Sequence, residues 1–174
     1  MRDRLLDSLE PTRYRRFLVY VMGAYKAHDI ENEAAFVFLE QVRDRLRSEG
    51  FNAFLATDVG IELDEMDAGT QSLEFARASN AVIFVVRNDG RNLGVGIETG
   101  AVLEDMSNRA RERVLFLHEA GVRSAMIAAV ADRWDATVRT FDAEDDLYDE
   151  ARLFIRDVMR REMTDKLSFP PESD

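Results

Sequence analysis

Five short apolar runs alternate with five longer helical patterns along most of the chain's 174 residues. The apolar runs are rich in Val, Leu, Ile and Phe, with little polar alternation, which is typical of strands buried on both faces. We expect these strands at residues 17–25, 51–57, 81–87, 113–118 and 136–141. The helices between and after them are expected at residues 31–49, 65–79, 95–111, 124–134 and 145–166.

This alternation predicts a parallel sheet with helices on both of its faces. The expected fold class is α/β, a doubly wound five-stranded parallel sheet of the flavodoxin-like type with strand order 2-1-3-4-5. A single α/β domain is expected over residues 17–166, with an N-terminal helical extension at 1–16 and a C-terminal tail at 167–174. In such a sheet the strand order reverses between strands 1 and 3, and ligands bind there, beyond the carboxyl ends of the strands.

The amino-acid composition argues against several kinds of partner and favours one cellular location. A formal net charge of −11 argues against binding to nucleic acid or to an anionic membrane. Because the chain has no cysteine, disulfides, thiolate catalysis and cysteine-ligated metal sites are excluded. It has no apolar run of transmembrane length, and its start is unlike a signal peptide, so we expect a cytoplasmic protein. Its acidic, lysine-poor composition favours a halophilic source, in which the acid excess serves solvation.

Residues 92–101, with the sequence NLGVGIETGA, lie where the third predicted strand turns into a helix. Glycines at such a turn let a ligand approach the backbone, and the helix dipole keeps Glu98 ionised in the first helical turn. The same residues also fit a tight turn followed by a glutamate that the helix dipole stabilises, an interpretation that requires no function. The predicted fold puts this segment at the switch point, next to the turn after strand 1, and so adds weight to a functional interpretation.

Other ligands of this fold require residues that the chain lacks. The turn at residues 22–25 has no hydroxyl-rich loop for a flavin phosphate, and the acidic pair and strand-5 lysine of a phosphoacceptor domain are missing. A Walker loop and the six-residue glycine fingerprint of dinucleotide-binding folds are also absent. His28 and His118 stand in no ligand-spaced motif, so neither a metal ion nor a cofactor is expected.

A carboxylate with aromatic and polar neighbours remains. Tyr20 and Tyr25 lie in and just beyond strand 1, and Asp89 and Asn92 precede Glu98. A carboxylate that attacks, a phenol that hydrogen-bonds and a ring that stacks on a base suit chemistry at an anomeric carbon.

The motif Gly94-x-Gly96-x-Glu98-x-Gly100 resembles the active-site motif of the nucleoside 2-deoxyribosyltransferases. Residues 19–25 are similar to that family's opening strand, and the resemblance covers the first 110 residues. It implies that Glu98 is the nucleophile and that Tyr20 orients it. Asn92 stands where members usually have an aspartate, and no aspartate aligns at residues 71–74, where members have one that handles the base.

The predicted site therefore has two catalytic residues, Glu98 and Tyr20, and a set of substrate-binding residues around them. That set is Gly23, Tyr25, Asp89, Asn92, Gly94 and Gly96.

The predicted function is cleavage or transfer of an N-glycosidic bond in a (deoxy)nucleoside or nucleotide, through a glycosyl-enzyme intermediate. The partner is thus a small molecule, and the resemblance implies a homo-oligomer. Two alternatives stay open. One is a TIR-like NAD hydrolase, which also uses a glutamate near a cleft. The other is a non-catalytic nucleotide-sensing or partner-binding module.

Overall fold

The computed structural model describes residues 1–23, 33–88, 100–106, 111–122, 132–134, 136–168 and 170. Its centre is a five-stranded sheet in the order β2-β1-β3-β4-β5, and every pair of neighbouring strands is parallel. The strands are β1 (Tyr14–Gly23), β2 (Phe51–Phe54), β3 (Ala81–Val86), β4 (Val114–Glu119) and β5 (Thr137–Phe141). The predicted α/β class, parallel sheet and strand order are thereby confirmed.

Two strand boundaries differ from the prediction by three residues, and those of β3, β4 and β5 differ by one residue at most. β1 begins at Tyr14, three residues early, because Tyr14 already pairs with Phe51 of β2 across an irregular register. β2 ends at Phe54 rather than Thr57, since Ala56–Asp58 forms a short 3₁₀ turn. The carboxylate of Asp58 accepts a 2.8 Å hydrogen bond from the Leu55 backbone N–H and thereby holds that turn.

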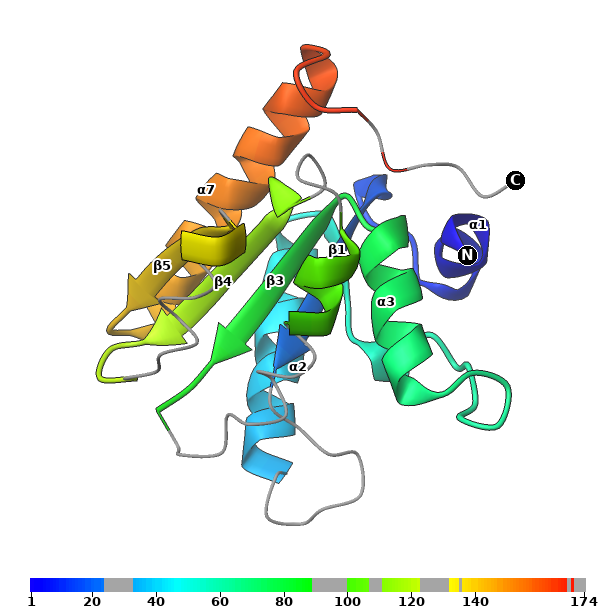
Figure 1. Ribbon diagram of the computed structural model, residues 1–174, viewed down its shortest axis with the longest axis horizontal. Coiled ribbons are helices and arrows are strands. Elements are labelled where there is room, and N and C mark those ends of the chain that lie inside the picture. Colours follow the sequence, from blue (N-terminus) through cyan, green and yellow to red (C-terminus); the bar gives the residue numbers. More distant parts are fainter. Residues whose placement is uncertain are drawn as a thin grey trace.

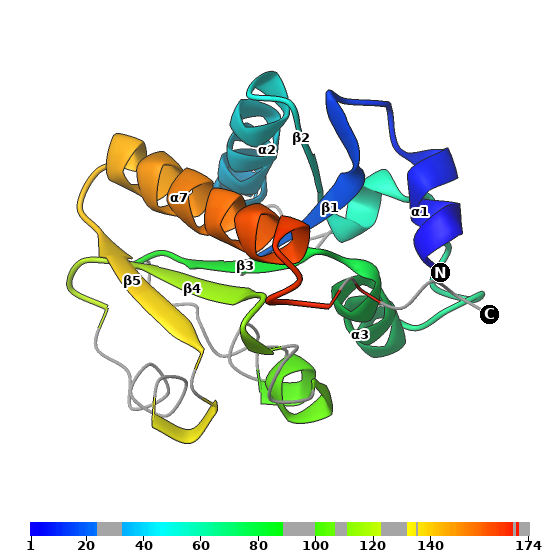
Figure 2. The ribbon, with the colours of Figure 1, turned by 90° about the horizontal axis from the view of Figure 1, so that it is seen from above.

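Helices cover both faces of the sheet, as Figures 1 and 2 show. The helices α2 (Glu33–Ser48) and α7 (Glu144–Met163) lie on one face, and α3 (Ala68–Ala78) lies on the other. Residues 100–105 are also helical and pack on the α3 face through Val102 and Leu103. The helix α1 (Arg2–Ser8) adds Leu5 and Leu6 to that same core.

Three of the helices have recognisable sequence signals at their ends. Asp67 caps α3, because its carboxylate accepts a 3.1 Å hydrogen bond from the Thr70 backbone N–H. Residues 144–146, all acidic, occupy the first turn of α7, where the helix dipole favours negative charge. Gly50, just after α2, has a φ of 96°, a backbone conformation that glycine adopts readily. None of the described helices has the length and apolar character that a membrane crossing needs.

A buried polar network lies at the amino edge of the sheet, where β3 and β4 begin. It consists of Arg2, Asn80, Arg113 and Glu162, which we call the amino-edge network. Arg2 donates to the Asn80 side-chain oxygen at 2.9 Å, and Asn80 donates to Glu162 at 2.9 Å. Arg113 forms an ion pair with Glu162 and donates to the Ser168 carbonyl. The network thus ties α1 and the end of α7 to the same edge of the sheet.

Candidate carboxyl-edge site

β1 and β3 are neighbours in the sheet, and the sequence predicts the site beyond their carboxyl ends. Gly23 pairs with Val85, so β1 and β3 end side by side. The chain leaves β3 there and re-enters the described part of the structure at Gly100. Six of the predicted site residues fall outside the described residues: Tyr25, Asp89, Asn92, Gly94, Gly96 and Glu98.

Tyr20 is described, and its ring lies in an aromatic cluster. It is 3% exposed, stacks on Phe54 at a centroid distance of 5.1 Å and meets Phe75 edge-on at 5.7 Å. Such contacts stabilise a core whether or not the phenol has a catalytic task. The structure therefore gives Tyr20 a packing role, and its predicted role beside Glu98 stays a prediction.

Gly23 is required by packing against α2. A Cβ added at this position would lie 2.7 Å from Cδ2 of Leu39 and 3.0 Å from the Val85 carbonyl oxygen. Leu39 is itself buried in the core under α2. This close packing is sufficient reason for a glycine at position 23, whether or not a ligand binds there. Substrate binding by Gly23 stays a prediction.

The helical segment that follows the Glu98 motif is held firmly on the α3 face. Arg77 of α3 donates two hydrogen bonds to Asp105, one of them from Nε at 2.7 Å. The hydrogen bonds to Asp105 have the largest effect and raise the pKa of Arg77 above its ordinary value. Burial opposes this rise, and the hydrogen bond to Glu74 and the charges of Asp105 and Glu74 add to it. The Trp134 indole N–H donates to Glu104 at 3.0 Å. Both contacts fix the helix into which the motif leads.

A group of polar side chains that the sequence analysis did not bring together lies beside this boundary. Asn88, His118, Glu119 and Thr140 form it, and we call it the carboxyl-edge cluster. The carboxylate of Glu119 accepts a 2.8 Å hydrogen bond from the Asn88 backbone N–H. β4 thereby holds the first residues that follow β3, immediately before the segment that contains Glu98.

Gly121 permits the close approach of two turns in this region. It has a φ of 88°, and a Cβ placed on it would lie 2.9 Å from the side-chain nitrogen of Asn88. A larger residue would be strained by the backbone angle and would also push Asn88 away. The turn after β4 therefore fits closely against the residue that follows β3.

His118 is held through both of its ring nitrogens. Nδ1 lies 3.2 Å from the Glu119 carbonyl oxygen, and Nε2 lies 3.0 Å from the Thr140 hydroxyl oxygen. A carbonyl oxygen only accepts hydrogen bonds, so Nδ1 carries a proton. In the neutral imidazole, Nε2 is then the acceptor for the Thr140 hydroxyl. The register between β4 and β5, which pairs His118 with Thr140, creates this contact.

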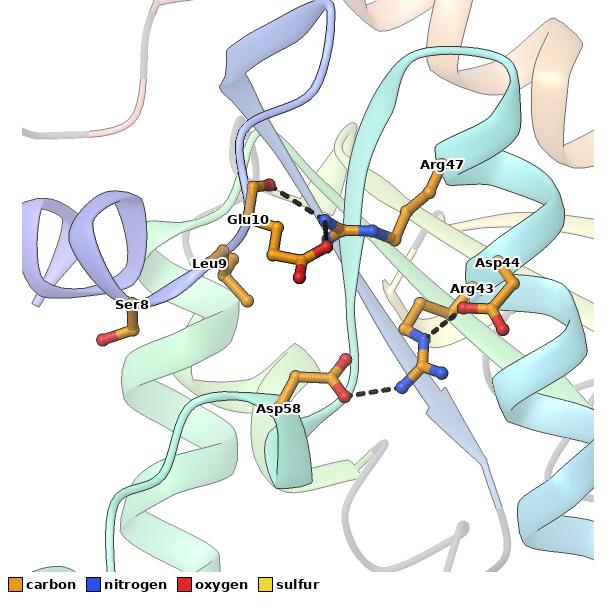
Figure 3. A pocket seen from close by; sticks show the side chains of 7 residues that line it. All are labelled: Ser8, Leu9, Glu10, Arg43, Asp44, Arg47 and Asp58. Atoms are coloured by element: carbon orange, nitrogen blue, oxygen red, sulfur yellow. Dashed lines mark hydrogen bonds and ion pairs between the residues drawn. The ribbon is translucent and has the colours of Figure 1, made fainter.

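A surface cavity of about 260 Å³ lies elsewhere, between α2, the turn after β2 and the segment that follows α1 (Figure 3). Its two guanidinium groups already have partners within the protein. Arg43 donates to Asp58 at 2.6 Å, and Arg47 donates to the Glu10 carbonyl oxygen at 2.9 Å. Because these groups are engaged internally, the cavity offers little free charge to a ligand and is not the predicted site.

None of the four residues of the carboxyl-edge cluster belongs to the predicted site. The predicted strands 4 and 5 end close to these residues in sequence. Because neighbouring parallel strands bring the residues at their ends together, those strand ends were the available sign of the cluster. Within the described part of the chain, no group of three His, Asp or Glu side chains could hold a metal ion.

Comparison with known proteins gives a family without an assigned activity. No curated protein matches the chain. The model of the family described as Domain of unknown function (DUF7509) matches residues 2–35 and 31–170. These segments include all five strands, the amino-edge network and the carboxyl-edge cluster. The chain therefore belongs to the family described as Domain of unknown function (DUF7509).

Proposed function

We propose that this protein cleaves or transfers the N-glycosidic bond of a nucleoside or nucleotide, with Glu98 as the nucleophile. The observation that carries the proposal is the reversal of strand order between β1 and β3, directly before the Glu98 motif. In open α/β sheets, ligands bind at this position. Tyr20 and the helical segment at 100–105 share one face of the sheet, which supports a role for both at this edge.

In the proposed reaction, the Glu98 carboxylate attacks C1′ as the bond between C1′ and the base nitrogen breaks. The transition state resembles an oxocarbenium ion, and a covalent glycosyl-enzyme forms. Water or a second base then attacks C1′ and releases Glu98. A nearby phenol such as Tyr20 would orient the carboxylate.

The test is covalent trapping with a 2-fluoro-arabino nucleoside, followed by mass spectrometry of the intact protein and its peptides. We expect an adduct on Glu98 in the wild type and none in Glu98→Gln. Glu104→Gln is the matched control, since Glu104 is an acidic residue of the following helical segment that contacts Trp134. Absence of both adduct and base release across a panel of nucleosides and nucleotides would overturn the proposal.

The same panel separates the two alternatives. Release of nicotinamide from NAD that is abolished by Glu98→Gln would support a TIR-like NAD hydrolase. A rise in Tm with a nucleotide, without turnover, would support a binding module. Asn92, in the place where the resembled family usually has an aspartate, and the lack of an aligned aspartate at residues 71–74 are the features that favour the binding module.

We further propose a cytoplasmic homo-oligomer from a halophilic source. The chain's acidic, lysine-poor composition supports the source and location, and the resemblance supports the oligomer. Light scattering coupled to size exclusion tests the oligomer, and thermal unfolding in low salt and in molar KCl tests the adaptation to salt. A monomer in both buffers would exclude the oligomer, and equal stability in both would argue against adaptation to salt.

A further inference from the structure

The outer side of the helix layer formed by α2 and α7 carries large apolar side chains that face solvent. Leu153, in the middle of α7, is 61% exposed, and Met163, at its end, is 80% exposed. Val37 of α2, which lies beside α7 on the same face of the sheet, is also exposed (Figure 2). Leu63 is the fourth such side chain in the described part of the chain, so this layer holds three of the four.

Leu153 belongs to a line of exposed residues along the outside of α7. The residues of α7 that are buried against the sheet recur at helical spacing and include Leu147, Ala151, Ile155 and Val158. An α-helix has 3.6 residues per turn, so positions 149, 153, 156 and 160 lie on the opposite side. These positions form what we call the outer stripe, and all of them are exposed: Asp149, Leu153, Arg156 and Arg160.

The charges of α7 are divided between its two halves. Residues 144–150 include five acidic side chains and no basic one, whereas residues 152–161 include four arginines and one aspartate. The helix dipole favours such charges within the first and the last turn. Asp149 and Arg156 lie beyond those turns, so the dipole does not explain their signs.

This division makes the outer stripe complementary to itself when two copies of the helix pack antiparallel. A twofold axis near Leu153 places the acidic half of each helix over the basic half of the other. A parallel arrangement would instead bring acid against acid and base against base. Antiparallel packing about a twofold axis is also the symmetry of most homodimers, in which both copies use the same surface.

The charged residues of the outer stripe remain available to a second copy. Asp149 pairs with Arg152 at 2.6 Å, and Arg160 pairs with Asp157. Both are exposed pairs three residues apart on one helix, a kind that contributes little to stability. Arg156 has no acidic partner among the described residues. The free protein therefore loses little when these side chains turn to a partner.

We propose that the outer stripe of α7 is the surface through which two copies of this chain form an antiparallel dimer. The inference rests on the proposed homo-oligomer and deepens it by naming the surface. Leu153 of each copy lies at the axis, and Asp149 faces the basic half of the other copy's α7. The dimer leaves the α3 face of both sheets uncovered, and that face includes Tyr20 and the helical segment at 100–105.

Charge reversal followed by mixing tests this pairing. Asp149→Arg makes the outer stripe basic throughout, and Arg156→Glu with Arg160→Glu makes it acidic throughout. Each variant alone brings like charges together, so we expect its dimer dissociation constant to rise about 100-fold or more at low ionic strength. An equimolar mixture of the two should restore a dimer that contains one copy of each. Size exclusion coupled to light scattering measures both results.

Arg4→Glu with Arg133→Glu is the matched control for the acidic variant. It makes the same change in net charge in exposed ion pairs with Glu65 and Glu104. Both arginines belong to segments that pack on the α3 face, next to Leu5 and Trp134. This control should dimerise like the wild type. A control that dissociates as much as the stripe variants would attribute their effect to net charge and overturn the interface.

Single cysteines test the antiparallel direction, because the chain has no cysteine of its own. Leu153→Cys should form a disulfide-linked dimer under mild oxidation, since the two copies of this position meet at the axis. Position 163 lies ten residues further on, which is about 15 Å along the helix. Antiparallel packing keeps its two copies about 30 Å apart, so Met163→Cys should not crosslink. A crosslink at 163 and none at 153 would overturn the antiparallel arrangement.

The remaining outcomes separate this interface from the other proposals. An oligomeric wild type whose stripe variants keep its mass would overturn the interface and leave the oligomer standing. Stripe variants that fail to associate when mixed would also overturn the interface. A monomeric wild type would overturn both. The glycosidic function is measured separately by trapping on Glu98, which the stripe variants should leave unchanged.

Discussion

The two edges of the sheet carry polar side chains under very different conditions. The amino-edge network is closed off from solvent, with Arg2, Asn80, Arg113 and Glu162 exposed by 6%, 1%, 4% and 3%. In the carboxyl-edge cluster, His118 and Glu119 are half-buried, and Asn88 and Thr140 are exposed. Both groups are hydrogen-bonded, so bonding alone does not distinguish them.

The two edges differ in how much stability the protein would lose if one polar residue there were replaced. Polar groups taken out of water must find partners inside the protein, and removal of one partner leaves the other uncompensated. At the exposed edge, water replaces a lost partner. The amino edge is therefore suited to holding the fold together, and the carboxyl edge retains polar groups that a ligand can still reach.

The largest effect on stability is expected from Arg113→Leu, which leaves the Glu162 carboxylate buried without its guanidinium partner. Removing one member of a buried ion pair costs roughly 3–5 kcal/mol in the free energy of unfolding. Urea denaturation measures this loss. Arg139→Leu is the control, since its ion pair with Glu150 is exposed and should contribute less than about 1 kcal/mol. Similar losses in the two variants would remove the contrast between the edges.

A smaller effect is expected from Gly23→Ala, where the new methyl group would collide with Leu39. Overpacking of this kind costs about 1–3 kcal/mol. In Gly100→Ala, the added Cβ meets no atom of the described residues within 4 Å, and the change should stabilise the protein by about 0.4–1 kcal/mol. Thermal or urea unfolding checks both signs. An unaltered stability in Gly23→Ala would argue against packing as the reason for this glycine.

A still smaller effect on stability is expected from Thr140→Val, because water can satisfy His118 when the exposed hydroxyl is removed. The free energy of unfolding should change by less than about 0.5 kcal/mol. A loss as large as that of Arg113→Leu would make the carboxyl-edge cluster a structural network like the one at the opposite edge. Urea denaturation of both variants in one buffer decides between these outcomes.

The smallest effect concerns Asp67, an exposed carboxylate at the start of α3. Hydrogen bonds from the Thr70 hydroxyl, and then from its backbone N–H, lower the Asp67 pKa below its ordinary value of 3.8. The resulting stabilisation is present above the unfolded pKa and is lost as the pH falls through the folded pKa. NMR titration should show the depressed pKa, and Thr70→Val should raise it. An unchanged pKa in that variant would contradict the assignment.

Much of the fold could be predicted from sequence because it depends on patterns that repeat locally. Runs such as residues 81–86 are apolar on both sides, which favours a parallel sheet, and the alternation with helices then gives the strand order. The early end of β2 depends instead on one side-chain contact, between Asp58 and Leu55. Such a contact leaves no periodic trace in the sequence.

The polar groups at both edges were harder to predict because they join residues far apart in the chain. Asn80 and Glu162 are ordinary polar residues until the end of α7 meets the beginning of β3. Thr140 acquires its contact with His118 only through the register of β4 and β5. The Glu98 motif could be recognised by contrast because its glycines and glutamate are adjacent in sequence.

The amino-edge network also sets an order of events during synthesis. Asn80 and Arg113 both bind Glu162, which leaves the ribosome 49 residues after Arg113. Domains can begin to fold as the chain emerges, so β1 to β4 can associate before α7 exists. Until α7 arrives, Asn80 and Arg113 lack this carboxylate. We therefore expect the nascent chain to stay susceptible to proteases at its amino edge and to become resistant in one late step.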